Sequence, residues 1–227
     1  MIIMSNIKVK YKNDLNLIPM RSFTSNEMDL FFAICARMED KNLATIRFTF
    51  EDLKALSAYK PTANIRLVSD LKQTYHKMLQ LQCGFEDDLN AEYFVLFTGF
   101  KIDSDNGYVD IRVNSDFEYV LNSLSKEFTK FELQEFTAIR SSYAKTMYRL
   151  LKQYKSTGFY KVRIEDFKRI LDIPKSYAMS DIDKKVLKPI MNELSDLFKP
   201  LIIKKIKAKK GNKIALLEFT FKEKIFK

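Results

Sequence analysis

One local sequence pattern occurs twice in this chain and constrains its fold more than any other feature. The first copy covers residues 47–54 (RFTFEDLK), and it aligns with residues 161–168 (KVRIEDFK). Each copy is a short alternating segment that leads into an Asp-containing helix start. An apolar helix precedes each copy, and a longer helix and a hairpin follow it. A repeat of this size predicts two copies of one small domain.

The charges are divided unequally between the two copies. Residues 1–125 carry 14 Lys and Arg against 17 Asp and Glu, a net charge of −3. Residues 126–227 carry 25 against 12, a net charge of +13, so the second copy holds the whole surplus of +10. A surplus of positive charge on one of two similar domains predicts that this domain binds a polyanion.

The composition predicts a folded cytoplasmic protein. The 227 residues are enough for two small domains, and 46% hydrophobic residues supply two cores. A charged fraction of 30% with only five Gly and five Pro argues against long disordered segments. Cys35 and Cys83 lie in apolar surroundings and are expected to be reduced. No secretory signal is expected, and the longest apolar run, residues 30–36, is too short to cross a bilayer.

The first copy follows a polar arm at residues 1–20. Its helices are expected at residues 25–38, 51–57 and 61–79, and its strands at residues 45–50, 93–102 and 108–113. Ser25 is expected to cap the first helix, and Pro61 to open the third. Asn106 and Gly107 mark the hairpin turn because both residues tolerate positive φ. The order helix, strand, helix, helix, hairpin is that of a winged helix-turn-helix domain.

The second copy begins after a polar joint at residues 122–130. Its helices are expected at residues 142–154, 164–171 and 180–197, and its strands at residues 160–163, 202–208 and 214–221. Ser180 is expected to cap its third helix, and Pro189 to kink it. The predicted fold is α+β, with two tandem winged helix-turn-helix domains in a pseudo-two-fold internal repeat. The expected domains are residues 1–122 and 123–227.

The third helix of a helix-turn-helix unit lies in the major groove of DNA. When the apolar side chains of this helix face the core, four charged side chains point outward: Asp181, Lys184, Lys185 and Lys188. Lys can donate to guanine O6 and N7, and Asp can accept from cytosine N4. An ordinary solvated helix face would show the same charges, so this pattern alone does not decide the function.

Two further features of the second copy favour nucleic acid. Hydroxyls and free backbone N–H groups open its first helix at residues 141–145, where they suit a phosphate. A basic hairpin tip at residues 209–213 has the shape of a wing that follows the DNA backbone or minor groove. The predicted DNA-binding residues of this domain are Ser141, Ser142, Tyr143, Lys145, Lys175, Ser176, Tyr177, Ser180, Asp181, Lys184, Lys185, Lys188, Lys209, Lys210, Asn212 and Lys213. Secondary contacts are expected from Lys60, Thr62, Asn64 and Arg66 of the first domain.

The sequence contains few residues that are suited to catalysis. His76 is the single histidine, so neither a metal cluster nor a histidine-based relay is expected. The sequence has no GxxxxGK[ST] phosphate-loop motif. Asp103, Asp105 and Asp110 lack the spacing of a calcium loop, and a hairpin turn explains them better. We therefore expect no catalytic residue, no metal, no cofactor and no enzymatic activity.

Several short runs in the second copy are more specific than the fold requires. They lie at residues 131–136 (FELQEF), 139–145 (IRSSYAK), 148–154 (YRLLKQY), 171–174 (LDIP), 186–190 (VLKPI) and 209–214 (KKGNKI). These runs resemble the initiator replication (Rep) proteins of iteron-containing, theta-replicating plasmids of Gram-positive bacteria, of the staphylococcal and lactococcal type. The resemblance is dense in the second domain and looser in the first, where Leu15-Asn16 and residues 48–56 carry it.

This resemblance implies two winged-helix domains that bind repeated DNA sites, the iterons, at a plasmid origin. Such initiators help to melt adjacent AT-rich DNA and recruit host replication initiator and helicase proteins, and they are not enzymes. The second domain is implied to be the main reader of the repeat. The first is implied to form a homodimer in the repressor form and to add DNA contacts in the monomeric initiator.

The residues themselves leave other functions open. A transcriptional repressor with two winged helices would have nearly the same sequence. A rolling-circle nickase would need a metal-bound tyrosine nucleophile, which a lone His76 does not favour. A protein-interaction module with a solvated basic face would show no preference for repeated DNA.

The first domain is also expected to self-associate. Its aromatic strand at residues 93–97 has more apolar surface than one small domain obviously needs. Packing of this strand under the helices of its own domain would account for the pattern equally well.

Overall fold

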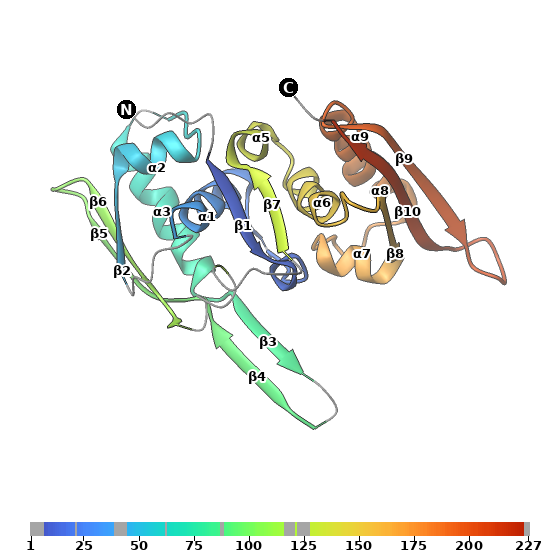
Figure 1. Ribbon diagram of the computed structural model, residues 1–227, viewed down its shortest axis with the longest axis horizontal. Coiled ribbons are helices and arrows are strands. Elements are labelled where there is room, and N and C mark those ends of the chain that lie inside the picture. The colour runs from blue at the N-terminus through green and yellow to red at the C-terminus, as the bar shows by residue number, and fades with distance from the viewer. Residues whose placement is uncertain are drawn as a thin grey trace. The chain divides into compact units, whose positions relative to one another are not determined.

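Figure 1 shows the computed structural model, which describes residues 7–20, 22–38, 45–61, 63–86, 89–115, 121 and 128–224. The chain forms two compact units. Unit 1 comprises Met1–Ile18 and Phe23–Ala138, and unit 2 comprises Pro19–Ser22 and Ile139–Lys227. The boundary therefore falls after residue 138, not after residue 122 as expected. Residues 126–138 carry two basic and three acidic side chains, so this shift leaves the charge asymmetry in place.

Unit 1 is a winged helix with an added N-terminal strand and hairpin. Its elements are β1 (Lys8–Lys12), η2 (Asn13–Asn16), α1 (Ser25–Met38), β2 (Thr45–Thr49), α2 (Phe50–Leu56), α3 (Asn64–Met78), β3 (Gln82–Glu86), β4 (Ala91–Val95), β5 (Phe97–Asp103), β6 (Tyr108–Val113), β7 (Phe128–Glu132) and α5 (Leu133–Ala138). The wing is the three-stranded sheet β2-β6-β5, and β3-β4 and β1-β7 form separate two-stranded sheets.

Helix α1 is the central element of unit 1. Its residues 30–35 are all fully buried, because α1 contacts α2, α3, α5 and β1. A helix that is apolar on all sides is a core helix when it is this short. Thr24 caps it in place of the expected Ser25, since the Thr24 hydroxyl accepts from the Glu27 N–H (3.3 Å) and Glu27 accepts from the Thr24 N–H (2.6 Å).

A buried polar network explains why residues 128–138 belong to unit 1. Strand β1 pairs antiparallel with β7, so that Val9 lies opposite Phe131. The Tyr11 hydroxyl donates to Asn16 Oδ1 (2.9 Å), and Asn16 Nδ2 donates to the Thr129 hydroxyl (2.8 Å). Phe32 of α1 packs against Phe131 with ring centroids 5.8 Å apart. The N-terminal arm is therefore ordered by a partner more than one hundred residues later in the chain.

Unit 2 repeats the same wing topology. Its elements are α6 (Ser142–Gln153), β8 (Phe159–Arg163), α7 (Ile164–Ile170), α8 (Met179–Ile182), η3 (Asp183–Leu187), α9 (Lys188–Leu194), β9 (Phe198–Lys207) and β10 (Ile214–Glu223). The sheet order is β8-β10-β9, which matches β2-β6-β5 strand for strand. Phe167 of α7 and Phe219 of β10 stack in the core with centroids 6.0 Å apart. The expectation of two winged-helix folds is confirmed.

The repeat extends to backbone details. Two residues after the end of the second helix, each unit has a residue with positive φ that is not glycine, Ala58 (50°) in unit 1 and Asp172 (52°) in unit 2. One cross-strand ion pair also recurs at the same place in each wing: Arg47–Asp110 (2.7 Å) and Lys161–Glu218 (2.9 Å). The two copies therefore share their scaffold and differ in their exposed side chains.

Two features of unit 1 differ from the sequence-based expectation. Helix α3 begins at Asn64, after Pro61 rather than at it. The single strand expected at residues 93–102 is two strands, because the chain breaks at Leu96 and β4 pairs with β3 instead of the wing. The β3–β4 hairpin was not predicted. Leu96 and Phe97 are fully buried, whereas Tyr93 is 61% exposed.

The third helix of unit 2 accommodates Pro189 through a wide turn. Proline has no N–H to donate within a helix. The preceding segment η3 is a π-helical turn, in which the Lys188 N–H donates to the carbonyl of Asp183. Pro189 then occupies the first turn of α9, where its missing N–H leaves no bond broken. The helix is therefore widened just before Pro189, and the kink expected at this residue stays a prediction.

Among the described residues, no helix is long and apolar enough to cross a membrane. Within the same part of the chain, no three His, Cys, Asp or Glu side chains are grouped so that they could hold a metal ion. Cys35 is fully buried and not disulfide-bonded. The side chain of Cys83 lies outside the described part of the structure.

Candidate nucleic-acid interface

The third helix of unit 2 presents lysines on its outward face. Ile182, Val186 and Ile190 are fully buried, which fixes the rotation of the helix against the core. As the sequence predicts, three lysines are exposed on the outward face: Lys184, Lys185 and Lys188. A helix with this face is suited to the negative potential of a DNA groove.

Asp181 is engaged by its own unit. Its carboxylate accepts from the Ala178 N–H (3.3 Å) and pairs with the Lys185 ammonium (2.9 Å). The Lys185 ammonium also lies 4.4 Å from the centroid of the Tyr177 ring. Lys185 holds the pKa of Asp181 below its usual range, and Asp181 raises the pKa of Lys185. The N-cap position is Ala178, so the expected cap at Ser180 is wrong.

Two backbone N–H groups just before α6 are bound by a carboxylate of the same unit. Glu193 of α9 accepts from the backbone N–H groups of Arg140 (2.6 Å) and Ser141 (3.2 Å). The Ser141 hydroxyl accepts from the Ala144 N–H (3.3 Å) and caps the helix. A phosphate would meet the charge of Glu193 here, which disfavours the phosphate site expected at residues 141–145; that site stays a prediction.

Lys145 is also not on the surface. It is fully buried, because α6 is the central helix of unit 2 and even its cationic positions are covered. Tyr143 and Ser142 are half-buried. Burial raises the pKa of the Tyr143 hydroxyl, with Tyr177 and Lys185 among the groups that act on it. Tyr143 therefore belongs to the cluster of Tyr177, Asp181 and Lys185 at the start of the third helix.

The wing of unit 2 ends in a basic tip. The turn closes through a hydrogen bond from the Ala208 N–H to the Lys213 carbonyl (2.9 Å), and Gly211 supplies a φ of 85°. The Lys207 ammonium donates to Asn212 Oδ1 (3.1 Å). Lys209, Lys210 and Lys213 are exposed, with Lys213 3.9 Å from Glu165. These lysines are placed as predicted for contact with phosphates.

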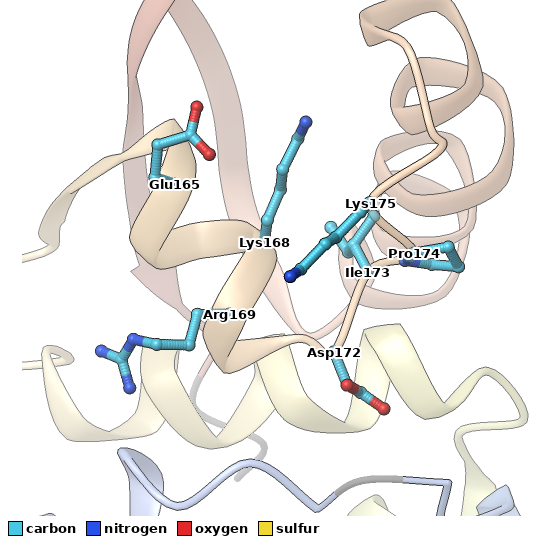
Figure 2. A pocket seen from close by; sticks show the side chains of 7 residues that line it. All are labelled: Glu165, Lys168, Arg169, Asp172, Ile173, Pro174 and Lys175. Carbon is cyan, nitrogen blue, oxygen red and sulfur yellow. The ribbon is translucent and has the colours of Figure 1, made fainter.

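A pocket of about 650 Å³ lies between α7 and the turn that leads into α8 (Figure 2). Its lining residues are Glu165, Lys168, Arg169, Asp172, Ile173, Pro174 and Lys175. Lys175 extends from the turn toward α7 (Figure 2). Asp172 accepts from the Ser22 N–H (3.3 Å), which partly engages its charge. Three cations against two carboxylates leave this pocket positive.

Sequence reasoning selected Lys175 from this pocket and missed Lys168 and Arg169. Both lie on the second helix, whereas the predicted contacts came from the first and third helices, the turn before the third helix and the wing. The signal that could have found them is their place in the repeat, just before a turn with positive φ. Ser176 and Ser180 are exposed close by in the sequence, as expected for residues near DNA.

The secondary residues of unit 1 are exposed where the structure describes them. Lys60, Asn64 and Arg66 lie at the surface around the start of α3. The Lys54 ammonium donates to Asn64 Oδ1 (2.7 Å), which leaves the Asn64 amide nitrogen available as a donor. Thr62 lies outside the described residues.

Comparison with known families agrees with this geometry. The family described as "Initiator Replication protein, WH1" matches residues 8–152. The family described as "Initiator Rep protein, WH2" matches residues 163–221. The chain belongs to the initiator replication proteins. The first match covers most of unit 1 and extends through most of α6 of unit 2, and the second lies within unit 2.

A curated initiator relative is the "Probable replication protein rep" of Bifidobacterium longum (strain NCC 2705). It is 38% identical over 197 residues, which cover 86% of this chain and 66% of the relative. This chain thus spans slightly less than two thirds of the length of that protein.

Two solved structures share the fold. The Pi initiator protein in complex with iteron DNA has a TM-score of 0.75 at 17% identity, with 96% of this chain and 98% of that chain covered. Domains 2 and 3 of RctB have a TM-score of 0.51 at 12% identity, with 90% and 84% covered. At these identities the likeness concerns the fold.

Proposed function

We propose that this initiator replication protein starts plasmid replication by binding repeated double-stranded DNA sites, the iterons, at a plasmid origin. Family membership supports the initiator role. The observation that carries the DNA contact is the exposed lysine face of η3 and α9 in the same unit as a basic wing. The Pi initiator protein, which shares the fold, was solved with iteron DNA.

Within this proposal, unit 2 is the main DNA-binding domain and unit 1 makes secondary contacts. The pocket of Lys168, Arg169 and Lys175 adds a phosphate contact beside the third helix. Bound protein promotes melting of the origin and recruits host replication initiator and helicase proteins. The protein acts by binding in the cytoplasm, without a cofactor and without catalysis.

Self-association of unit 1 is a further part of the proposal. Strand β4 pairs with β3 in a two-stranded sheet, and its Tyr93 is 61% exposed. An open strand edge with an exposed aromatic residue is suited to pairing with a second copy. The homodimer would act as repressor of its own gene, and the monomer would bind iterons.

Sedimentation of the full chain with Tyr93→Lys checks the dimer. The wild-type chain is expected to dimerise at high concentration and the variant to remain monomeric. Leu79→Lys, at an exposed position beyond α3, is the control and should dimerise normally. A wild-type chain that stays monomeric, or a variant that dimerises equally well, contradicts this interface.

An origin-dependent replication assay tests the proposed function. The gene and its flanking DNA are joined to a marker that cannot replicate alone, and transformants are counted. Wild-type protein should sustain the plasmid, and the double variant Lys184→Ala, Lys188→Ala should not. Repression of the flanking promoter without plasmid maintenance would instead support a winged-helix transcriptional repressor.

A further inference from the structure

The internal repeat relates the outward face of α3 to that of the third helix in unit 2. Three buried positions fix the register, because Leu67, Leu71 and Tyr75 of α3 are each buried 115 residues before an equally buried residue of unit 2: Ile182, Val186 and Ile190. The same offset assigns each outward residue of unit 2 a counterpart in unit 1.

This register shows that the outward faces of the two third helices differ in chemistry. Ser180, Lys184 and Lys188 of unit 2 are exposed, and their counterparts in unit 1 are also exposed: Ile65, Ser69 and Gln73. Two lysines are therefore replaced by neutral polar residues, and one serine by an isoleucine. At two further positions Arg66 corresponds to Asp181 and Asp70 to Lys185, so these five positions of unit 1 carry no net charge. Such a face contributes less to phosphate neutralisation than that of unit 2, but its side chains match base edges.

Ile65 is the unusual member of this face. Its side chain is 86% exposed, although it is large and apolar. A single exposed apolar residue needs no explanation on an arbitrary surface. Here neither packing nor helix propensity accounts for it, because a β-branched residue is a poorer helix former than alanine. Its position near the start of the third helix is one from which side chains reach base edges.

A tyrosine of the preceding turn acts on the same helical position in both units. In unit 1 the Tyr59 hydroxyl donates to Asp70 (2.5 Å), and in unit 2 the Tyr177 ring contacts Lys185, the counterpart of Asp70. A tyrosine of the turn therefore contacts the same helical position in each unit, by a hydrogen bond in unit 1 and by a cation–ring contact in unit 2. This supports the transfer of reading positions from one unit to the other.

We propose that Ile65 contacts the C5-methyl group of a thymine in the major groove, so that unit 1 contributes base discrimination rather than affinity. The methyl group is the one apolar feature that distinguishes thymine in that groove. The inference rests on the proposed DNA-binding function, and names the chemistry that unit 1 recognises.

The experiment uses a duplex that the full chain enriches from a randomised pool. Each thymine of that duplex is replaced in turn by deoxyuridine, which removes only the methyl group. For the wild-type chain, at least one replacement should weaken binding roughly fourfold, the factor for one methyl-sized group removed from water. For Ile65→Ala, the thymine and deoxyuridine duplexes should bind equally at that position.

Two further variants serve as controls for this comparison of thymine and deoxyuridine duplexes. Ile65→Val keeps a branched apolar side chain and should retain most of the methyl effect. Leu79→Ala removes an exposed apolar side chain just after the C-terminal end of the same helix and should show the full wild-type effect. Because all variants share the same DNA pairs, changes of DNA shape caused by deoxyuridine cancel.

The outcomes separate this inference from the proposed function. If a duplex is enriched but each deoxyuridine replacement changes the affinity of the wild-type and Ile65→Ala chains by the same factor, the inference is overturned. The proposed function is not affected by this result. Failure to enrich any duplex over random DNA overturns the proposed function and the inference with it. A change in sedimentation of Ile65→Ala without a change in the methyl effect assigns this helix face to a protein contact and also overturns the inference.

Discussion

The wings of units 1 and 2 have the same strand order and opposite tips. In unit 1, the turn between β5 and β6 carries Asp103 and Asp105, and Asp103 accepts from the Asn106 N–H (3.0 Å). In unit 2, the turn between β9 and β10 carries the lysines at positions 209, 210 and 213. One scaffold therefore presents an acidic turn in one copy and a basic turn in the other.

The sheet face of each wing carries one cross-strand ion pair. In unit 1, Arg47 is bound by both oxygens of Asp110 (2.7 and 2.8 Å) and stacks on Tyr108, 3.7 Å from its ring centroid. Arg47 also lowers the pKa of Asp110. The pair has its counterpart in Lys161–Glu218 of unit 2, so the two wings differ in charge at their tips and not on their sheet faces. The exposed lysines of the unit 2 tip support the proposal that unit 2 is the main DNA-binding domain.

Charge reversal at the unit 2 tip should have the largest effect. Replacing Lys209, Lys210 and Lys213 with Glu removes three phosphate contacts and adds repulsion. The slope of log K against log salt should fall by about 2.7, and cognate and random DNA should weaken alike. Fluorescence anisotropy over a salt series measures both quantities. A loss confined to cognate DNA would mean that the wing reads bases.

The third helix of unit 2 should give the next largest effect. Lys184→Ala or Lys188→Ala is expected to weaken cognate binding roughly 5- to 150-fold, the loss of about 1–3 kcal/mol for a base contact. Circular dichroism should be unchanged, since both side chains are exposed. Gln73→Ala, at the position in unit 1 that corresponds to Lys188, is the matched comparison and should cost less. Equal losses in both units would remove the distinction between them.

The pocket of unit 2 should have a smaller and sequence-independent effect. The double variant Lys168→Ala, Lys175→Ala should reduce the salt slope by about 0.9, the value for one phosphate contact. Lys199→Ala, an exposed position at the start of β9, is the control and should leave the slope unchanged. An unchanged slope in the double variant would place the DNA backbone away from this pocket.

Asp181 should have the smallest effect, with the opposite sign. Asp181→Asn removes a negative charge beside Lys185 and should strengthen binding to cognate and random DNA about twofold to fivefold, the range of one exposed charge interaction. The same anisotropy titration measures this. A selective loss for cognate DNA would restore Asp181 as an acceptor for cytosine.

The sequence predicts features that depend on local pattern. The winged-helix order, helix α1 and the two wing turns follow from apolar spacing, caps and glycine at Gly107 and Gly211. The exposed lysines at positions 184, 185 and 188 follow from the same periodicity once Ile182 and Val186 are placed in the core. Local charge and helical period determine these features, so no distant partner is needed to find them.

Features that depend on distant contacts could not be predicted. The Glu193 carboxylate accepts from the Ser141 N–H, just before α6, from 52 residues away in the sequence. No local pattern links the two positions. Lys145 looks exposed by type and is buried because α6 is covered on all sides. The pairing of β1 with β7 places the unit boundary after residue 138, since it joins segments from the two ends of unit 1.

Footprinting on the DNA that flanks the encoding gene tests the central claim most directly. The full wild-type chain should protect several directly repeated sites, and the Lys184→Ala, Lys188→Ala variant should protect none of them at the same concentration. Protection of a single palindrome, or equal protection by wild type and variant, would contradict an initiator that binds iterons through the third helix of unit 2.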